Sequence, residues 1–269
     1  MIYLADFFKS RSTWAQEYGA DAQSWSWFSL THIIILLVTI VFCFIFAYLY
    51  KKADAKKRKI LQWVIVGLML LEEVQMFTIS IATNQFEISF LPLHLCGINI
   101  FFCLIHAIWG KKWTEEFLYA LALPGALLAL IVPTWTAVPP WNYIFIFSTG
   151  YHIFLIAYPI MLLAGGMRPK FKNLKEVCYV LIPLAIVIFG INQFTGYMAE
   201  VTGNAKFWST NFMFLYKPES LFTVLANLFG LQGMWYLITL PFLLVIIWGL
   251  FYAPWMIIEK KTKKNSLNS

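Results

Sequence analysis

Residues 220–258 read SLFTVLANLFGLQGMWYLITLPFLLVIIWGLFYAPWMII, and none of these 39 positions is Asp, Glu, Lys or Arg. A helix needs about 20 apolar residues to cross the hydrocarbon core of a bilayer, where it must satisfy its own backbone hydrogen bonds. The stretch is nearly twice that length, so we expect it to break at Gly230, Gly233 or Pro241. We expect Ser220–Phe229 to lie in the interface or to re-enter, and the last span to follow.

The whole chain has the same character. Of its 269 residues, 61% are hydrophobic and 12% are charged, whereas soluble domains have about 45–50% and about 25%. This composition excludes a soluble enzyme, a disulfide scaffold and a disordered chain. The four cysteines lie in apolar runs or near the start of one, and they indicate no disulfide framework; they are Cys43, Cys96, Cys103 and Cys178.

The predicted fold class is all-α, a polytopic membrane bundle of seven transmembrane helices. The spans are expected at about Trp27–Tyr50, Ile60–Thr83, Phe90–Trp109, Phe117–Pro133, Trp141–Ala164, Val177–Ala199 and Met234–Ile258. We divide the chain into an outer juxtamembrane segment 1–26, a transmembrane domain 27–258 and a basic tail 259–269. Within the domain, the aromatic-rich connection 200–219 is expected to pack over the mouth of the bundle.

The distribution of basic residues predicts the orientation. Sixteen of the twenty Lys and Arg residues follow the odd-numbered spans, and four lie on the opposite side. Because cytoplasmic loops collect Lys and Arg, the N-terminus is predicted outside and the C-terminus inside. The net charge of +7 is thereby explained by topology. We therefore expect membrane lipids as partners and no nucleic acid, while the oligomeric state stays open.

Ionisable side chains within spans are costly and indicate function. Glu72, Glu73, Asn99 and His152 are expected near the midplane, and His32, His94, Cys96, Asn192 and Gln193 in the outer half. Together they predict one polar cavity that leans outward.

Cys96 lies in the first turns of a helix that we expect to begin near Pro92. The positive end of a helix dipole favours a thiolate there, and a histidine could complete its activation. On a regular helix Asn99 shares the face of Cys96, whereas His94 points about 200° away.

A structural interpretation stays open for each of these residues. Cysteine is a common small filler of apolar helices, and an imidazole at His152 could simply bond Ser148 or a backbone carbonyl. Glu72 and Glu73 can be ion-pair partners or proton acceptors. His32 and His94 can be interfacial, and Asn192, Gln193 and Asn211 can bond between helices.

The stretch FLPLHLC, residues 90–96, resembles the Pro-Leu-His-Leu-Cys signature of the YwaF family of bacterial integral membrane proteins. The stretch NFMFLYKP, residues 211–218, is similar to that family's Asn-Tyr-Met-Tyr-Leu…Lys-Pro segment, with Phe212 in place of a tyrosine. The resemblance runs from the first span to the last, and His32 and His152 stand where the pattern expects them. It implies a bacterial plasma membrane protein.

A eukaryotic relative of that family is a transmembrane acyltransferase that acts on ether lysophospholipids through a cysteine nucleophile and a histidine partner. Carried over by motif, the resemblance implies Cys96 as the nucleophile and His152 as the base. It does not transfer the substrate.

The leading hypothesis is a membrane-embedded acyltransferase or lipid hydrolase without a cofactor. In it Cys96 attacks an ester carbonyl of a phospholipid from the outer leaflet, and His152 transfers the proton. Asn99 would donate to the oxyanion, Glu72 or Glu73 would orient a histidine, and the remaining polar residues would bind substrate; these are His32, His94, Asn192, Gln193 and Asn211.

Two other classes remain. One is a transporter or receptor-like binder of a small polar solute, which should tolerate Ser or Ala at Cys96. The other is a metal-dependent membrane hydrolase with His and Glu ligands, although no pair has the spacing of ligands on one helix face. We therefore assign no metal site.

Overall fold

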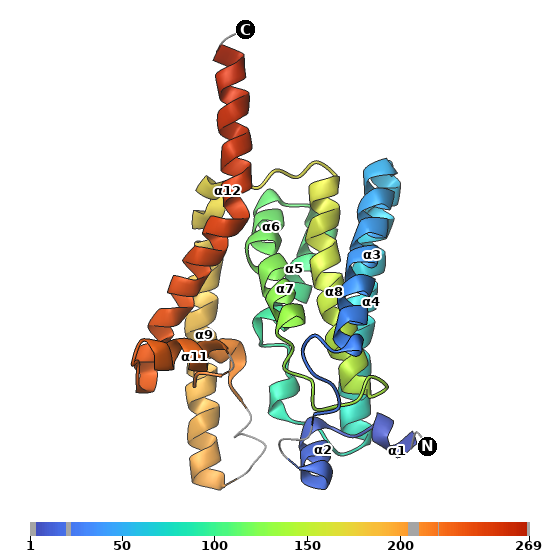
Figure 1. Cartoon of the computed structure of the whole chain (residues 1–269), viewed down its shortest axis with the longest axis vertical. Coiled ribbons are helices and arrows are strands. Elements are labelled where there is room, and N and C mark those ends of the chain that lie inside the picture. The colour runs from blue at the N-terminus through green and yellow to red at the C-terminus, as the bar shows by residue number, and fades with distance from the viewer. Residues whose placement is uncertain (1–3, 20–22, 204–209, 220, 268–269) are drawn as a thin grey trace.

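The computed structural model describes residues 4–19, 23–203, 210–219 and 221–267, and within these ranges it is all-helical (Figure 1). The first helices are α1 (Leu4–Phe7), α2 (Arg11–Tyr18), α3 (Leu30–Lys52), α4 (Ala55–Ala82), η1 (Ile88–Phe90), α5 (Leu95–Trp109) and α6 (Lys112–Phe117). They are followed by η2 (Leu118–Ala122), α7 (Leu123–Ile131), α8 (Tyr143–Ala164), η3 (Phe171–Asn173) and α9 (Leu174–Thr202). The last are η4 (Phe212–Phe214), α11 (Leu221–Leu228), η5 (Gly233–Ile238) and α12 (Thr239–Leu267).

Among the described residues, seven helical stretches are long and apolar enough to cross a membrane. They are Leu30–Lys52, Ala55–Ala82, Ile88–Trp109, Lys112–Ile131, Tyr143–Ala164, Phe171–Thr202 and Gly233–Thr262. Each overlaps one predicted span, so the seven-helix membrane bundle is confirmed. The ends shift by a few residues because capping side chains set them: Ser29 accepts the His32 N–H at the start of α3, and Asp54 accepts the Lys57 N–H at the start of α4.

Helix α8 is the centre of the bundle, and it packs against α3, α4, α5 and α7. In the most apolar window of α8, 67% of the residues are buried inside the chain, against 17% in the spans formed by α9 and α12. Figure 1 shows α9 and α12 on the far side of α6 and α7 from α3 and α4. Polar groups on α5 and α8 are therefore enclosed by neighbouring helices, whereas most of α9 and α12 faces outward.

The fourth span contains a π-helical turn, η2, whose residues are all buried. Pro124 follows it, and a proline has no N–H to offer the carbonyl four residues earlier. That carbonyl belongs to Ala120, and it accepts a hydrogen bond of 3.0 Å from Trp248 Nε1 on α12. The irregular turn thus exposes a backbone acceptor that fastens α12 to the rest of the bundle.

The first helices dock on the end of the bundle that carries the connections 83–94 and 132–142, here called the N-terminal end. Asn142, the N-cap of α8, donates from Nδ2 to the carbonyls of Asp6 and Lys9, at 2.9 Å each. Gln85 Oε1 accepts the Ser10 N–H at 2.6 Å and the Thr13 hydroxyl at 2.8 Å. These bonds help to tie the described part of the juxtamembrane segment to the bundle.

The long uncharged stretch breaks at its glycines, as predicted. Gly230 and Gly233 have φ values of 64° and 56°, which L side chains rarely adopt. Pro241 falls instead in the first turn of α12, where a missing N–H costs no helical hydrogen bond. Helix α11 precedes these breaks and lies across the direction of α9 and α12 (Figure 1); Ser220 lies outside the described residues.

Candidate functional site

Helix α5 begins at Leu95, three residues later than the predicted start near Pro92. The cause is a tight turn in which Gly97 lies against the Pro92 backbone: a Cβ on Gly97 would lie 2.7 Å from Pro92 Cα. His94 is therefore the N-cap, with extended backbone angles of φ −69° and ψ 154°. The helical angle that separates His94 from Cys96 in the prediction does not apply, because His94 is outside the helix.

Cys96 is the second residue of α5, and its side chain is half-buried. This position carries the positive end of the helix dipole, because the first N–H groups of a helix have no intrahelical acceptor. Within the described part of the chain, the Cys96 thiol makes no hydrogen bond to another side chain. It does lie within electrostatic range of Tyr151 on α8, the residue that precedes His152.

The ring of His152 is held from two sides. Its Nδ1 lies 2.6 Å from the Ser148 carbonyl oxygen, and a carbonyl can only accept, so Nδ1 carries a proton. The ring also stacks on Trp135 at 5.1 Å between centroids and 15° between planes. Trp135 is fixed in turn by its hydrogen bond to Thr149 Oγ1. In the neutral imidazole, Nε2 is then the unprotonated nitrogen, the atom that a general base uses.

The 210–219 loop packs against the start of α5. The ring of His94 contacts Phe212 and Phe214 with centroid distances of 5.2 Å and 6.3 Å. Tyr216 lies against α9, where a Cβ on Gly196 would be 2.6 Å from the Tyr216 hydroxyl. Of the aromatic residues in the predicted outer connection, Phe207 and Trp208 lie outside the described residues.

Two asparagines shape this loop. The fully buried Asn192 of α9 accepts the Phe212 N–H and donates to the Phe212 carbonyl, both at 2.9 Å. Asn211 accepts the N–H groups of Tyr216 and Lys217 and donates to the Lys217 carbonyl. Between them, Met213 and Phe214 have φ values of 55° and 57°. Non-glycine residues with such angles store strain, which concentrates at functional segments.

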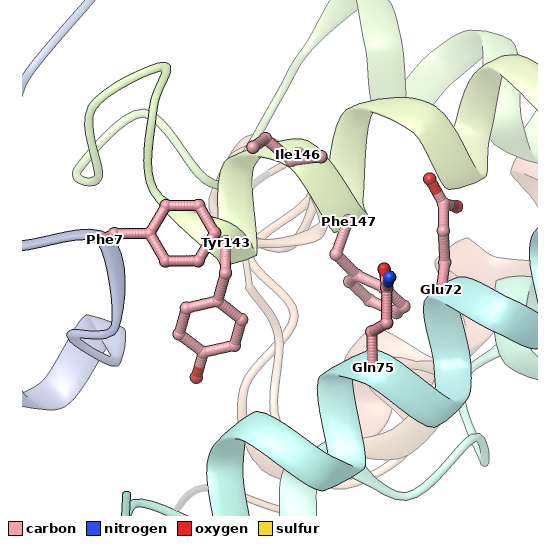
Figure 2. Close-up of a pocket in the computed structure, with 6 residues that line it drawn as sticks. All are labelled: Phe7, Glu72, Gln75, Tyr143, Ile146 and Phe147. Carbon is pink, nitrogen blue, oxygen red and sulfur yellow. The ribbon is translucent and has the colours of Figure 1, made fainter. Parts of the chain in front are cut away.

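Glu72 lines a cavity of about 50 Å³ (Figure 2), and like Cys96 it lies within electrostatic range of Tyr151. The other lining residues are Phe7, Gln75, Tyr143, Ile146 and Phe147. The Glu72 carboxylate fits against the bare backbone of Gly150 on α8, and its Oε2 is buried without a hydrogen-bond partner in the described part of the chain. Glu73 lies within electrostatic range of Tyr151. Among the described residues neither glutamate bonds a histidine; the Ser148 carbonyl orients His152 instead.

Other predicted residues have defined places. His32 accepts the Phe28 N–H at Nδ1 and donates from Nε2 to the Leu130 carbonyl, each at 2.8 Å, so both ring nitrogens are engaged. Asn99 is buried and donates to the Leu95 carbonyl, while its Oδ1 has no hydrogen-bond partner within the described ranges. Gln193 is exposed on the outward face of α9.

Sequence reasoning missed Arg11, which it counted only towards topology. Arg11 as a whole residue is exposed to solvent, but protein atoms lie around its guanidinium. Burial by these atoms lowers the pKa of Arg11, and the charge of Glu87 opposes this shift. Arg11 lies within electrostatic range of His94 and of His152. Arg11, His94, Cys96, Tyr151 and His152, called the polar cluster below, are therefore brought within electrostatic range of one another from three parts of the sequence.

No group of three or more His, Cys, Asp or Glu side chains within the described ranges lies close enough to hold a metal ion. The predicted ligand candidates His32, Glu72, Glu73, His94 and His152 do not form such a group. What the polar cluster offers is a thiol, imidazoles, a phenol and a guanidinium.

Comparison with known families gives one finding: the model of the TMEM164 family matches residues 27–252. The matched region contains the whole of the helical bundle from before α3 into α12. No curated protein and no solved structure matches the chain. The match indicates a transmembrane protein family and does not bear on the YwaF resemblance, which stays a prediction.

Proposed function

The chain belongs to the TMEM164 family of transmembrane proteins, and we propose that it is a membrane-embedded acyltransferase or lipid hydrolase that moves phospholipid acyl chains through a thioester on Cys96. In this proposal His152 is the general base and acid. The N-terminal end faces the outside of the cell, and the lipid comes from the outer leaflet. The chain is then a multi-pass protein of the bacterial plasma membrane.

One observation supports the proposal above the others. The Ser148 carbonyl and the Trp135 ring hold His152 with Nδ1 protonated, which leaves Nε2 to accept a proton. A triad uses the same logic, since a fixed acceptor on one ring nitrogen sets the tautomer that makes the other nitrogen a base. His32 differs, because both of its ring nitrogens are engaged by backbone groups.

The chemistry follows in two steps. His152 Nε2 takes the Cys96 proton as the sulfur attacks an ester carbonyl; the C–O bond breaks, and the released lipid oxygen takes the proton from His152. A hydroxyl of a lysolipid, or water, then gives its proton to His152 and attacks the thioester. The C–S bond breaks and the sulfur regains the proton. No external oxidant or cofactor is required.

The neighbouring groups have matching roles. The free N–H groups at the start of α5 are suited to the oxyanion that forms on the ester carbonyl. Asn99 donates to the Leu95 carbonyl and fixes the first turn of α5 from within, which favours a positioning role over direct donation. The described contacts include no hydrogen bond between Cys96 and His152, and the proposal requires one to form when substrate binds, as is common for catalytic hydrogen bonds.

The test is a lipid-remodelling assay on purified protein in mild detergent, with mixed phosphatidylethanolamine and phosphatidylglycerol and a lysophospholipid acceptor. We expect Cys96→Ser and His152→Gln each to lower acyl transfer or fatty acid release by about 10²–10⁴-fold. Cys178→Ser is the matched control, since Cys178 is also half-buried but lies on α9. Full activity in either of the first two variants would refute the mechanism and favour the solute binder.

A further inference from the structure

The Arg11 guanidinium differs from the other basic groups described near the N-terminal end. Lys9 pairs with Asp6 and Glu17 at 2.6 Å each, and Lys217 pairs with Glu219 at 3.6 Å. Arg11 forms no ion pair or hydrogen bond with any residue that the structure describes. A guanidinium has five N–H donors and stays charged in proteins, so Arg11 presents an unneutralised cation with unused donors.

The position of Arg11 is fixed on both sides along the chain. Ser10 and Thr13 bond Gln85, and the Ser12 hydroxyl donates to Glu87 Oε1 at 2.7 Å. Asn142 holds the carbonyl of Lys9 from the start of α8. The backbone around Arg11 is therefore held against the bundle, while the Arg11 side chain itself has no partner among the described residues.

The surroundings of Arg11 are those of a binding site. Its charge acts on His94 at the start of α5, on His152 in α8 and on Tyr143 in the first turn of α8. Tyr143 is 4% exposed, and its hydroxyl has no hydrogen-bond partner among the residues that the structure describes. Figure 2 shows this hydroxyl pointing away from the cavity of Glu72. A buried phenol without a partner is uncommon and calls for one.

The carboxylate whose charge acts on Arg11 does not neutralise it. Glu87 forms no ion pair with it within the described residues, and the Glu87 oxygens accept the Ser12 and Ser89 hydroxyls instead. The Arg11 donors and the Tyr143 hydroxyl would both be satisfied by an anion with several acceptor oxygens that can reach the two groups. A phosphate group is such an anion, since the planar fork of a guanidinium matches two phosphate oxygens.

We propose that Arg11, assisted by Tyr143, binds the phosphate group of the ligand, and that this contact sets the ester bond of a phospholipid over Cys96 and His152. This inference rests on the proposed acyl chemistry for its purpose, but the phosphate site itself does not. The phospholipid class belongs to the proposed function; this inference adds the residue that selects it, so that loss of Arg11 removes the preference for lipids with a phosphate over neutral glycerides of the same chain length.

The experiment uses the whole chain with the change Cys96→Ser. This variant cannot form a thioester, so the assay measures binding alone. Equilibrium binding of radiolabelled oleoyl lysophosphatidylglycerol is compared with that of monooleoylglycerol, which lacks only the phosphoglycerol part. Arg11→Gln should weaken lysophosphatidylglycerol binding about tenfold, as the loss of a hydrogen-bonded charge predicts, and change monooleoylglycerol binding less than twofold. Arg11→Lys, which keeps the charge without the fork, should fall between.

Lys217→Gln is the matched control, because it removes one positive charge from the same end of the protein and should leave both affinities unchanged. Thermal melting of each variant shows that it is folded. An equal loss for the two lipids, or an equal loss in Lys217→Gln, overturns the proposal. Displacement of the lipid by millimolar inorganic phosphate only when Arg11 is present supports the phosphate site with a soluble source; the absence of displacement supports the lipid headgroup.

The two proposals fail separately. Arg11-dependent binding of lysophosphatidylglycerol without any acylation of Cys96 would keep the phosphate site and remove the proposed catalysis. If wild-type Cys96 is acylated but Arg11→Gln does not change the affinity for lysophosphatidylglycerol, the proposed catalysis stands and the phosphate site is refuted.

Discussion

The 210–219 loop gives the sharpest prediction about local stability, through Asn192. Its amide forms two hydrogen bonds with the Phe212 backbone, both 2.9 Å long, in a fully buried place. The change Asn192→Ala removes both bonds at once. Among the described contacts of the loop the Phe212 N–H then has no partner, while the Phe212 carbonyl keeps only its longer bond from the Leu215 N–H, at 3.2 Å.

The magnitude follows from these contacts. Each hydrogen bond contributes about 1 kcal/mol net, so the variant should lose about 2 kcal/mol of docking free energy. The left-handed conformations of Met213 and Phe214 cost about 1–2 kcal/mol each, which leaves the docked loop little reserve. A loss of about 2 kcal/mol raises the open fraction of the loop roughly thirtyfold.

Hydrogen–deuterium exchange in detergent measures this directly. Peptides that cover the described loop residues should exchange about thirtyfold faster in Asn192→Ala, while peptides from α8 keep their protection. Gln193→Ala is the control, because the next residue is exposed on the same helix. Unchanged protection at Phe212, or an equal effect of Gln193→Ala, would refute the view that Asn192 holds the loop over His94.

Three further predictions concern stability in detergent. Gly97→Ala should lower the unfolding free energy by about 1–3 kcal/mol, because the added Cβ meets the Pro92 backbone. The control Gly190→Ala should be neutral or mildly stabilising, because its Cβ meets nothing within 4 Å. Equal melting temperatures of the two variants would contradict this packing. Trp248→Phe should cost about 1–3 kcal/mol by leaving the Ala120 carbonyl unpaired, while Trp235→Phe, 70% exposed, should cost nothing measurable. The hydrogen bond from the Lys57 N–H lowers the pKa of the Asp54 carboxyl in the folded state. The helix cap that Asp54 provides therefore stabilises the fold at a pH above the ordinary Asp pKa, and this stabilisation is lost as the pH falls through the lower pKa of the folded state. The difference in melting temperature between wild type and Asp54→Ala should shrink on acidification, and a difference that grows would contradict the assignment.

The fold was predictable because hydropathy alone determines where a chain can cross a bilayer. All seven spans follow from apolar runs of sufficient length, and the break at Gly230 and Gly233 follows from an uncharged stretch too long for one helix. The start of α5 was not predictable in the same way. It depends on the approach of Gly97 to Pro92, a tertiary contact that hydropathy does not record.

The site was predictable in its residue types and less so in its connections. Intramembrane cost singles out His94 and His152, whereas the helix start and the family resemblance single out Cys96; the charge of Arg11 acts on both histidines, and Cys96 lies within electrostatic range of Tyr151. The catalytic roles of these residues stay a prediction. The Ser148 carbonyl that orients His152 was among the partners expected for a structural imidazole, but which ring nitrogen it engages depends on the rotamer and needed the structure. Arg11 was missed because its charge has an ordinary explanation in topology, and only the docking of α2 brings it to the cluster.

The measurement that tests the central claim most directly is the intact mass of the purified protein after incubation with phosphatidylethanolamine and phosphatidylglycerol. Wild type, Cys96→Ser and Cys178→Ser are compared with and without hydroxylamine. The account predicts an acyl-sized, hydroxylamine-labile adduct on wild type and Cys178→Ser that is missing from Cys96→Ser. Wild-type protein that stays unmodified while its lipids remain unchanged would contradict it.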